Sequence, residues 1–558
     1  MYKVNLLIRL SASVLFIGVA SINYAETNNS KPNSSKSKPN ILLIMADDLG
    51  YSDIGAFGSE IHTPNIDALA HDGRIFTDYH TAPSCSPTRA QLLSGTDHHQ
   101  AGLGAMREAR PAHLDNNPGY EGYLNERSLS IAEILKDNGY HTYISGKWHL
   151  GMTPETNAKA KGFERSFTLI QGADSHFKNS PEGSARRAIY TLDGARVPIS
   201  SFPDHYFSTD YYTDKLIEFI DKNKESQKPF FAYAAYTAPH APIQAPAIYS
   251  DKYKGIYNVG YDVIRNARIK KQKELGIISI DLKPANTLDT VSSLPNNKQW
   301  QELSPIQKAN EARRMEVYAG MIDNLDHNVG RLVAYLKDTN QYDNTLIFFV
   351  SDNGPDAGDI EFPIPKNYNN TYESIGTENS YIFLGARWAE VSAAPFHLWK
   401  ATAGEGATTV PAIVKLPQQL HSENSYQGFT SVLDILPTVL DVANINIPKN
   451  QYNGRKINNP IGYSWKKVLE NKSSKIRPDN FTFADELHGF KYTKKDGWKI
   501  AYQARANLGT GTWELYNLKN DRGETSNLAN SNPNKVKELV ETYQQYKKDN
   551  GVAEYFNK

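Results

Sequence analysis

The sequence predicts an α/β fold: a large mixed, mostly parallel sheet flanked by helices, followed by a smaller C-terminal α+β subdomain with a short antiparallel sheet. Four short apolar runs without polar alternation are typical of strands that are buried on both faces. Segments with helical periodicity separate these runs, which favours an α/β arrangement. After about Lys475 the pattern changes to short runs with turn signals, which predicts the second, antiparallel part.

The expected buried strands are Ile41–Met45, Thr142–Ser145, Phe230–Tyr236 and Leu346–Val350. Residues Ser130 to Glu133 have the form of a capping box, which predicts that a helix begins there. Apolar residues recur at helical spacing from Met315 to Leu336, which predicts one long helix. The polar stretches 250–305 and 355–395 are expected to be insertions, and insertions near strand ends often shape the mouth of a substrate site.

We interpret the chain as two domains that follow an N-terminal leader segment. Residues 38–475 form the catalytic α/β domain, and residues 476–558 form the C-terminal subdomain. The segment from Asn480 to Leu518 predicts short antiparallel strands, with a turn at Asp496–Gly497. A final amphipathic helix is expected because Val536, Leu539, Val540 and Tyr543 recur on one helical face.

The N-terminus predicts export to the periplasm or the medium. Lys3 and Arg9 precede an apolar run, Leu10 to Ala20, that is too short to span a bilayer and typical of a signal peptide. We expect residues 1–25 to be the signal peptide, with cleavage after Ala20 or Ala25, and residues 26–37 to be a disordered polar linker. No cysteine lies near the cleavage site, so no stable membrane anchor is expected.

Composition narrows the class of protein. The chain has 558 residues, 39% apolar and 22% charged, which is typical of a soluble globular protein. Lys plus Arg and Asp plus Glu both number 61, so net charge predicts no nucleic-acid partner. The single cysteine, Cys85, cannot form an internal disulfide, so it is either a buried structural residue or chemically used.

Acidic side chains follow two of the expected strands. Asp47 and Asp48 come directly after the first, and Asp352 and Asn353 come directly after the last. The exits of such strands are where open α/β sheets bind ligands. Either segment alone is equally consistent with a solvated turn. Together they offer carboxylate and amide oxygens, the ligands that Ca²⁺ or Mg²⁺ prefers.

Cys85–Ser86–Pro87–Thr88–Arg89 is the most specific motif. Pro87 suits the first turn of a helix, which places Cys85 at a helix N-terminus, where backbone N–H groups favour an anion. Arg89, one turn later, is expected to reach back toward residue 85.

Further candidates are Lys147, His149 and His240, which also lie at strand exits. Lys147 and His149 are two residues apart and would share a face on an extended chain. Singly, such residues are more often structural. Asp97–His98–His99 has the composition of a transition-metal site, but a hydrogen-bonded structural role is favoured because no third soft ligand is in view.

These motifs together resemble those of the type I sulfatases of the alkaline phosphatase superfamily, and within that family they look most similar to those of bacterial arylsulfatases. The resemblance covers roughly residues 38 to 550. Its motifs are Pro39 to Gly50, Pro83 to Gly95, Gly139 to His149, Ser351 to Gly354 and Trp513 to Leu518.

The resemblance implies a sulfuric ester hydrolase that cleaves a small-molecule sulfate ester. It implies that a dedicated maturation enzyme converts Cys85 to formylglycine (3-oxoalanine). It implies that Asp47, Asp48, Asp352, Asn353 and the modified residue 85 bind Ca²⁺. Arg89 and Lys147 would steady the formylglycine, and His149 would be the base that acts on it. His240, Lys400 and Lys147 would hold the sulfate, with His240 giving a proton to the leaving oxygen.

The sequence departs from the family pattern in two places. The first signature ends in Ser94–Gly95 rather than Thr-Gly, and Gly404 to Pro411 lacks the arginine that relatives often carry. Two alternatives remain open at this point. One is a phosphomonoester or phosphonate hydrolase of the same superfamily, and the other is a catalytically silent protein that binds sulfate or sulfated glycans.

Overall fold

The computed structural model describes residues 38–178, 188–288, 298–358, 367–418, 425–504 and 508–556. The predicted signal peptide (1–25) and linker (26–37) lie outside the described residues. Among the helices that are described, none is both long and apolar enough to cross a membrane.

A large mixed sheet forms the centre of the fold. In the described part of the chain it has ten strands in the order β10-β2-β9-β8-β1-β7-β3-β4-β5-β6. Their bounds, in that order, are Thr430–Ser431, Arg74–His80, Thr409–Lys415, Thr345–Ser351, Asn40–Ala46, Phe230–Ala235, His141–Lys147, Arg165–Leu169, Tyr190–Leu192 and Ala195–Val197.

The middle of this sheet is parallel, as predicted. β1 pairs with β7 and β8 in parallel, β3 pairs with β7 and β4 in parallel, and β10 pairs with β2 in parallel. The antiparallel pairs are β2 with β9, β8 with β9, β4 with β5, and β5 with β6. The four strands expected from the apolar runs are all present, with ends shifted by one or two residues. Because β1 and β8 run side by side in parallel, their carboxyl ends meet at one edge.

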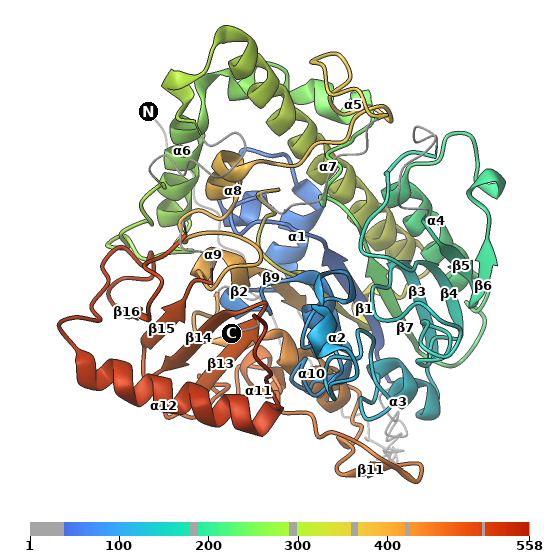
Figure 1. Cartoon of the computed structure of the whole chain (residues 1–558). Coiled ribbons are helices and arrows are strands. Elements are labelled where there is room, and N and C mark those ends of the chain that lie inside the picture. The colour runs from blue at the N-terminus through green and yellow to red at the C-terminus, as the bar shows by residue number, and fades with distance from the viewer. Residues whose placement is uncertain are drawn as a thin grey trace, which may run out of the picture. The chain divides into compact units, whose positions relative to one another are not determined.

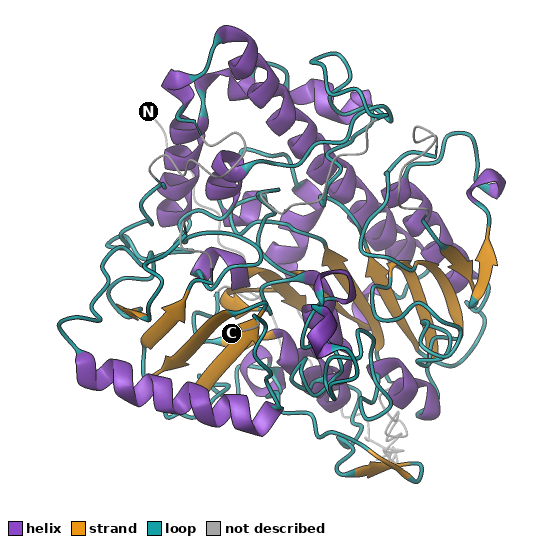
Figure 2. Ribbon diagram, viewed as in Figure 1, coloured by secondary structure: helices purple, strands orange, loops and turns teal. Residues whose placement is uncertain are grey.

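Helices cover both faces of the sheet, which explains why its strands are apolar throughout (Figures 1 and 2). Leu42 and Ile44 of β1 join one hydrophobic cluster, and Ile41 and Leu43 join another. The first cluster includes residues of α1 (Pro64–Asp72), α4 (Ser208–Asp221) and α7 (Pro305–Asp338). The second includes residues of α2 (Cys85–Ser94), α3 (Ile131–Asp137), α10 (Ile435–Val442) and α11 (Lys466–Leu469).

Local sequence signals fix two of these helices. At α3, Ser130 Oγ accepts a hydrogen bond from Ala132 N, and Ser130 N donates to Glu133 Oε2, so the predicted capping box is confirmed. α7 is the long helix expected from the spacing of Met315 to Leu336. α5 (Ala247–Ser250) ends where the first polar insertion begins, the two insertions contain α6 (Tyr261–Glu274) and α8 (Ala386–Ser392), and α9 (Glu405–Thr408) follows.

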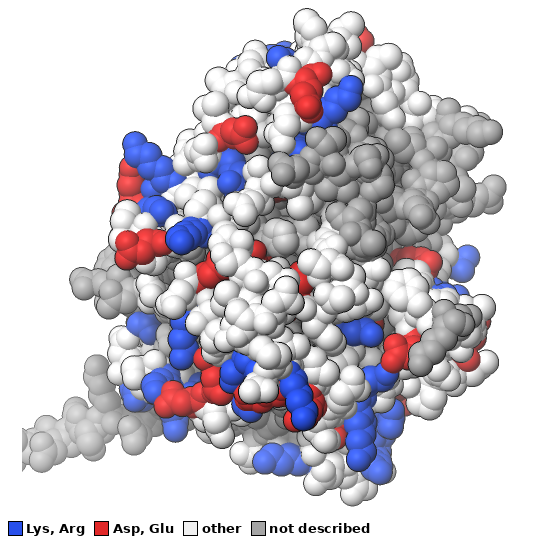
Figure 3. Space-filling view, turned by 60° about the vertical axis from the view of Figure 1, so that its left-hand side comes forward, with Lys and Arg blue, Asp and Glu red and all other residues white. Residues whose placement is uncertain are grey.

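A short antiparallel sheet follows the large one in the chain, as predicted. Its strands are β13 (Thr482–Leu487), β14 (Phe490–Lys495), β15 (Trp498–Tyr502) and β16 (Glu514–Asn517), and a small hairpin, β11 (Gln451–Tyr452) with β12 (Arg455–Lys456), precedes them. The final helix, α12 (Pro533–Asn550), packs its buried Leu539 against Ile500 and Leu515 of this sheet. Basic and acidic side chains are interspersed on the face in Figure 3, in keeping with the balanced charge.

Candidate active site

A buried acidic cluster lies where β1 and β8 end. Asp47 and Asp48 follow β1, and Asp352 and Asn353 follow β8, so the parallel pairing of the two strands brings them together. Asp48 N donates to Asp352 Oδ1 at 3.2 Å, and Asn353 Nδ2 donates to Asp48 Oδ1 at 2.6 Å. All four residues are at most 2% exposed. The prediction that these side chains from two strand exits lie close together is confirmed by this geometry.

Two lysines balance this buried negative charge. Lys147 Nζ donates to Asp47 Oδ2 at 2.7 Å, and Lys400 Nζ donates to both oxygens of Asp48, at 2.7 and 3.0 Å. Burial alone would raise the pKa of Asp47, but Lys147 and the other nearby cations hold it well below its usual range. The lysines are correspondingly held protonated, with the pKa of each raised by these carboxylates against the effect of burial.

Arg89 supports the cluster from α2. Its Nε and Nη2 donate to Asp352 Oδ2 at 3.0 and 2.8 Å, and its Nη1 donates to the Lys147 carbonyl at 3.3 Å. Burial and the neighbouring charge of Asp47 nevertheless raise the pKa of Asp352 to about 7. The sequence predicts that Arg89 reaches back toward residue 85; the structure shows Asp352 as the partner of its guanidinium, and the Cys85 side chain is near enough to contribute to the raised pKa of Arg89.

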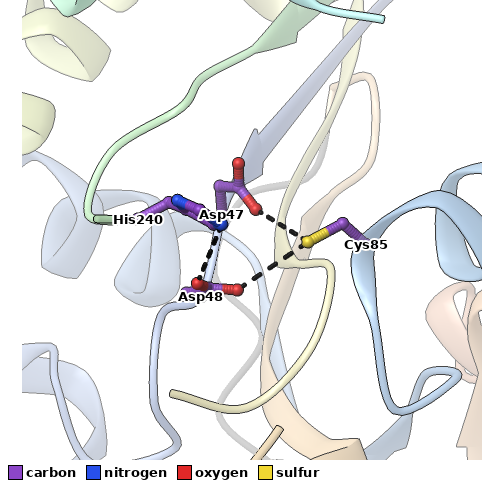
Figure 4. Close-up of side chains that lie close together, drawn as sticks. All are labelled: Asp47, Asp48, Cys85 and His240. Atoms are coloured by element: carbon purple, nitrogen blue, oxygen red, sulfur yellow. Dashed lines mark hydrogen bonds and ion pairs between the residues drawn. The ribbon is translucent and has the colours of Figure 1, made fainter. Parts of the chain in front are cut away.

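Cys85 is the first residue of α2 and faces the acidic pair. Its Sγ lies 3.4 Å from Asp47 Oδ1 and 3.9 Å from Asp48 Oδ1 (Figure 4). The side chain is 2% exposed, and burial raises the pKa of its thiol well above the usual range. The predicted position of Cys85 at a helix N-terminus is confirmed, and the structure adds that the terminus opens onto the carboxylates.

The donor set fits a hard divalent cation. Three carboxylates and one amide converge, and the Oδ1 atom of Asn353 is buried without a hydrogen-bond partner among the described residues. An unpaired buried carbonyl oxygen costs about 1–3 kcal/mol, which a cation ligand would recover. Oxygen donors of this kind suit Ca²⁺ or Mg²⁺.

His240 approaches the same aspartates from the side opposite Cys85 (Figure 4). Its Nδ1 lies 2.6 Å from the Ala241 carbonyl, which can only accept, so Nδ1 carries a hydrogen. Its Nε2 lies 3.5 Å from Asp48 Oδ2 and therefore faces the site. His176 Nε2 pairs with the His240 carbonyl at 3.0 Å, which fixes the loop that carries the ring.

His149 contributes a second imidazole, in which Nε2 rather than Nδ1 has a hydrogen-bond partner. Its Nε2 lies 2.7 Å from Glu108 Oε1, and its Nδ1 is buried with no partner among the described residues. Burial lowers the pKa of His149, which favours the neutral ring at neutral pH. The prediction that Lys147 and His149 share a strand face is wrong in its reason, because β3 ends at Lys147 and His149 has a left-handed backbone, φ 55°.

These groups line or underlie a cavity of about 420 Å³. The functional side chains at its surface are Cys85, His149, His240 and Lys400. Apolar and aromatic side chains dominate the rest of its wall: Met106, Met152, Ile170, Tyr381 and Phe383. The 355–395 insertion contributes Asp356, Gly358, Tyr381 and Phe383 to the lining, whereas no described lining residue comes from 250–305.

Two residues of this site escape sequence reasoning. Glu108 lies in a short 3-10 turn (Arg107–Ala109), and Gly172 lies in a loop after β4. A Cβ atom at Gly172 would lie 2.7 Å from His149 Cε1, so the glycine lies directly against the ring. Neither residue belongs to a motif, because both act across long sequence separations from irregular segments.

Asp97, His98 and His99 form a structural network. His98 pairs with Asp485 at 2.8 Å, and His99 pairs with Asp97 at 3.0 Å and Glu486 at 3.2 Å. The second ring nitrogen of His98 pairs with the Leu103 carbonyl at 2.8 Å. With every ring nitrogen engaged, the contacts fit the structural role favoured from the sequence, and they tie the loop after α2 to β13.

Two lysines from the C-terminal sheet bind the segment from Gly404 to Pro411, which lacks the arginine that relatives often carry. Thr409 contacts Glu405, and two lysines of the C-terminal sheet, Lys494 and Lys499, bind Glu405 at 3.0 and 2.8 Å. Positive charge thus reaches this region from another part of the chain. Lys400, assigned near this segment, lies in the cavity beside Cys85.

Residues 39–445 match the sequence model of the Sulfatase family. An uncharacterized sulfatase of Schizosaccharomyces pombe is 40% identical over 92% of this chain and 94% of its own. The arylsulfatase of Klebsiella aerogenes is 37% identical over 75% of this chain and 89% of its own. Among solved structures, Ps i-CgsB in complex with k-i-k-neocarrahexaose is 25% identical with a TM-score of 0.65, covering 93% of this chain and 95% of that one.

Proposed function

The chain belongs to the sulfatase family, and from this premise we propose that it is an arylsulfatase that cleaves sulfate monoesters to a phenol or alcohol and inorganic sulfate. One observation carries the proposal. Cys85 lies at a helix N-terminus, faces two buried carboxylates and lines a cavity that is also lined by two histidines and a lysine. These are the components that an oxyanion-forming hydrolysis needs: a nucleophile position, cations and proton carriers.

We propose Ca²⁺ as the cation, bound by Asp47, Asp48, Asp352, Asn353 and residue 85. The unpartnered Oδ1 of Asn353 and the three converging carboxylates support it. When bound, Ca²⁺ would relieve repulsion among the carboxylates and polarise a sulfate oxygen.

We propose that a separate maturation enzyme oxidises Cys85 to formylglycine, with loss of the sulfur. The hydrated aldehyde would supply an oxygen nucleophile, which a buried thiol cannot. The high pKa of the Cys85 thiol, caused by burial, accords with a residue that does not act as a thiolate.

The remaining roles belong to side chains of the chain itself. Lys147 and Lys400 carry positive charge toward the sulfate oxygens, and Arg89 holds Asp352 in place. His240 Nε2 can give a proton to the leaving oxygen; the ring must then be doubly protonated, which Asp48 favours and burial opposes. His149 Nδ1, which is buried and has no partner among the described residues, can accept a proton.

The apolar wall supports an aryl rather than a sugar leaving group. Met106, Met152, Ile170, Tyr381 and Phe383 can pack on an aromatic ring, and they make up more of the wall than the polar side chains Arg107, Glu108, Gln171 and Asp356. The Klebsiella aerogenes arylsulfatase is the relative that agrees with this proposal.

We further propose that the protein is exported to the periplasm or the medium. The basic and apolar pattern of residues 1–25 supports this proposal. Expression of the full chain with fractionation, compared with a variant that carries Leu15→Arg in the middle of the apolar run, tests it. Equal export of both proteins contradicts the proposal.

Two measurements test the activity. Peptide mass spectrometry around residue 85 is expected to show the aldehyde in place of the thiol. Turnover of 4-nitrophenyl sulfate is expected to exceed turnover of 4-nitrophenyl phosphate. Preference for the phosphate would favour a phosphomonoester hydrolase, and an unmodified thiol with sulfate binding but no turnover would favour a silent binding protein.

A further inference from the structure

We propose that Glu108 is a positioning residue that holds His149 in the tautomer whose Nδ1 accepts a proton, and that it acts through its negative charge. The inference rests on the proposed hydrolase function and adds to it a residue in no motif of the sequence. It begins from the 2.7 Å contact between Glu108 Oε1 and His149 Nε2.

Three features fix the position of the His149 ring: its own backbone conformation, Gly172 and Glu108. Its backbone has φ 55°, an uncommon conformation for a residue other than glycine, which turns the side chain away from the direction that β3 would give it. Gly172 lies against one face of the ring, closely enough that a Cβ there would overlap it. Glu108 holds the Nε2 edge. Strained backbone of this kind persists where the surrounding structure determines it, and such residues cluster at functional sites.

The partner chemistry then sets the tautomer. An ionised carboxylate can only accept hydrogen bonds, so Nε2 carries the hydrogen in the Glu108 contact. In the neutral ring Nδ1 is therefore the nitrogen with the free lone pair. Nδ1 is buried and has no partner among the described residues, and the ring lines the same cavity as Cys85. The nitrogen that is free to accept a proton thus belongs to a ring that lines the cavity where the chemistry is proposed.

Glu108 also stabilises the positive charge that the His149 ring acquires when it accepts a proton. When Nδ1 takes a proton from a hydroxyl group in the cavity, an O–H bond breaks, an N–H bond forms and the ring becomes a cation. The proton stays on Nδ1 until it passes to water, and Glu108 remains ionised throughout. Lys147 and Arg89 disfavour that cation, whereas Glu108 favours it, so Glu108 raises the proton affinity of His149 against burial and the two cations.

An ion pair that is fully exposed to water would change the proton affinity of a histidine only slightly. Glu108 is 38% exposed while His149 is 10% exposed, so water screens the carboxylate only in part. Glu108 also lines the cavity mouth, so its pairing with His149 lies within the proposed site.

Steady-state kinetics on matched variants test the role. Glu108→Gln keeps the size and removes the charge, Glu108→Asp keeps the charge, and Glu155→Gln makes the same charge change at a fully exposed glutamate that does not line the cavity. We expect Glu108→Gln to lower kcat on the order of 10²-fold with KM within about threefold, as for groups that orient a histidine base. Glu108→Asp should retain at least about a tenth of wild-type kcat, and Glu155→Gln should match wild type.

The pH profile separates positioning from structure. Because removing the carboxylate lowers the pKa of His149, the acidic limb of the kcat profile should move to lower pH in Glu108→Gln. An unmoved limb together with kcat within twofold of wild type overturns the inference. If wild type itself turns over no sulfate ester, the proposed function fails rather than this assignment.

Nitrogen NMR of histidine-labelled protein provides a readout that needs no activity. The His149 signals, assigned with a His149→Gln variant, should show protonated Nε2 and unprotonated Nδ1 in wild type at neutral pH, and a changed tautomer balance in Glu108→Gln. Protonated Nδ1 in wild type overturns the inference whether or not the protein is active.

Discussion

Gly172→Ala tests whether the placement of the His149 ring matters at the level of tenths of an ångström. The added Cβ would lie 2.7 Å from His149 Cε1 and 2.9 Å from Nε2. Gly172 does not have a left-handed backbone, so alanine introduces no conformational strain of its own. The substitution therefore acts through the ring of His149.

The size of the effect follows from these distances. Ordinary van der Waals contact begins near 3.4 Å, so the nearest ring atom is short of it by the difference from 2.7 Å, about 0.7 Å. The ring must move by roughly this amount, toward or away from Glu108. Since a misplacement of about 1 Å can cost about 10²-fold in rate, we expect kcat to fall by about 10- to 100-fold, or about 1.4–2.7 kcal/mol.

The assay is turnover of 4-nitrophenyl sulfate at saturating Ca²⁺, with thermal unfolding measured on the same preparations. Gly428→Ala is the matched control, because its Cβ would lie 2.5 Å from the Tyr426 hydroxyl, and neither residue lines the active-site cavity. Overpacking is expected to cost each variant about 1–3 kcal/mol of stability, while only Gly172→Ala loses turnover. Equal losses of turnover in both, or kcat within twofold of wild type in Gly172→Ala, would refute the reasoning.

Three other predictions concern the metal, the C-terminal sheet and pH. Asn353→Ala should raise the Ca²⁺ concentration for half-maximal thermal stabilisation by on the order of tenfold, and an unchanged midpoint contradicts its role as a ligand. Glu405→Ala leaves the buried Lys494 and Lys499 without a shared partner and should cost about 3 kcal/mol or more in denaturant unfolding; a loss below about 1 kcal/mol counts against a structural ion network. Hydrogen bonds to two carboxylates raise the pKa of His99 to about 10 against the effect of burial. The charged ring therefore contributes its full stabilisation below about pH 6.5, and this contribution is lost as the pH rises toward 10. The stability difference between wild type and His99→Gln should shrink over that range, and a constant difference would contradict a stabilising charge on His99.

Sequence reasoning succeeds where a functional side chain follows a regular element. Asp47 and Asp352 could be placed together because each follows a buried apolar run, and parallel strands bring their carboxyl ends to one edge. Cys85 could be placed at a helix start because Pro87 suits the first turn. These inferences need only local periodicity and one topological rule.

Sequence reasoning fails where the position of a side chain depends on irregular backbone or on packing between elements that are distant in the sequence. The shared-face argument for Lys147 and His149 assumes an extended chain, but φ at His149 is 55° and the strand has already ended. Helical spacing predicts that Arg89 reaches back toward residue 85, because that spacing is readable in the sequence. It does not reveal the partner of the guanidinium, Asp352, which lies 263 residues away and directly follows β8.

The division between the two kinds of residue is physical. Asp47, Lys147 and Asp352 lie at or directly after the ends of strands, and Cys85 begins α2, so the core fixes their backbone and their spacing leaves a pattern in the sequence. Glu108 and Gly172 instead adjust one ring from a 3-10 turn and a loop, and a contact of 2.7 Å between residues 41 apart leaves no periodicity to detect. If Glu108 acts as proposed, the choice of which His149 nitrogen accepts the proton is made outside every motif of the sequence. Chains that share the motifs but differ at these two positions would then differ in pH dependence while binding the same cation.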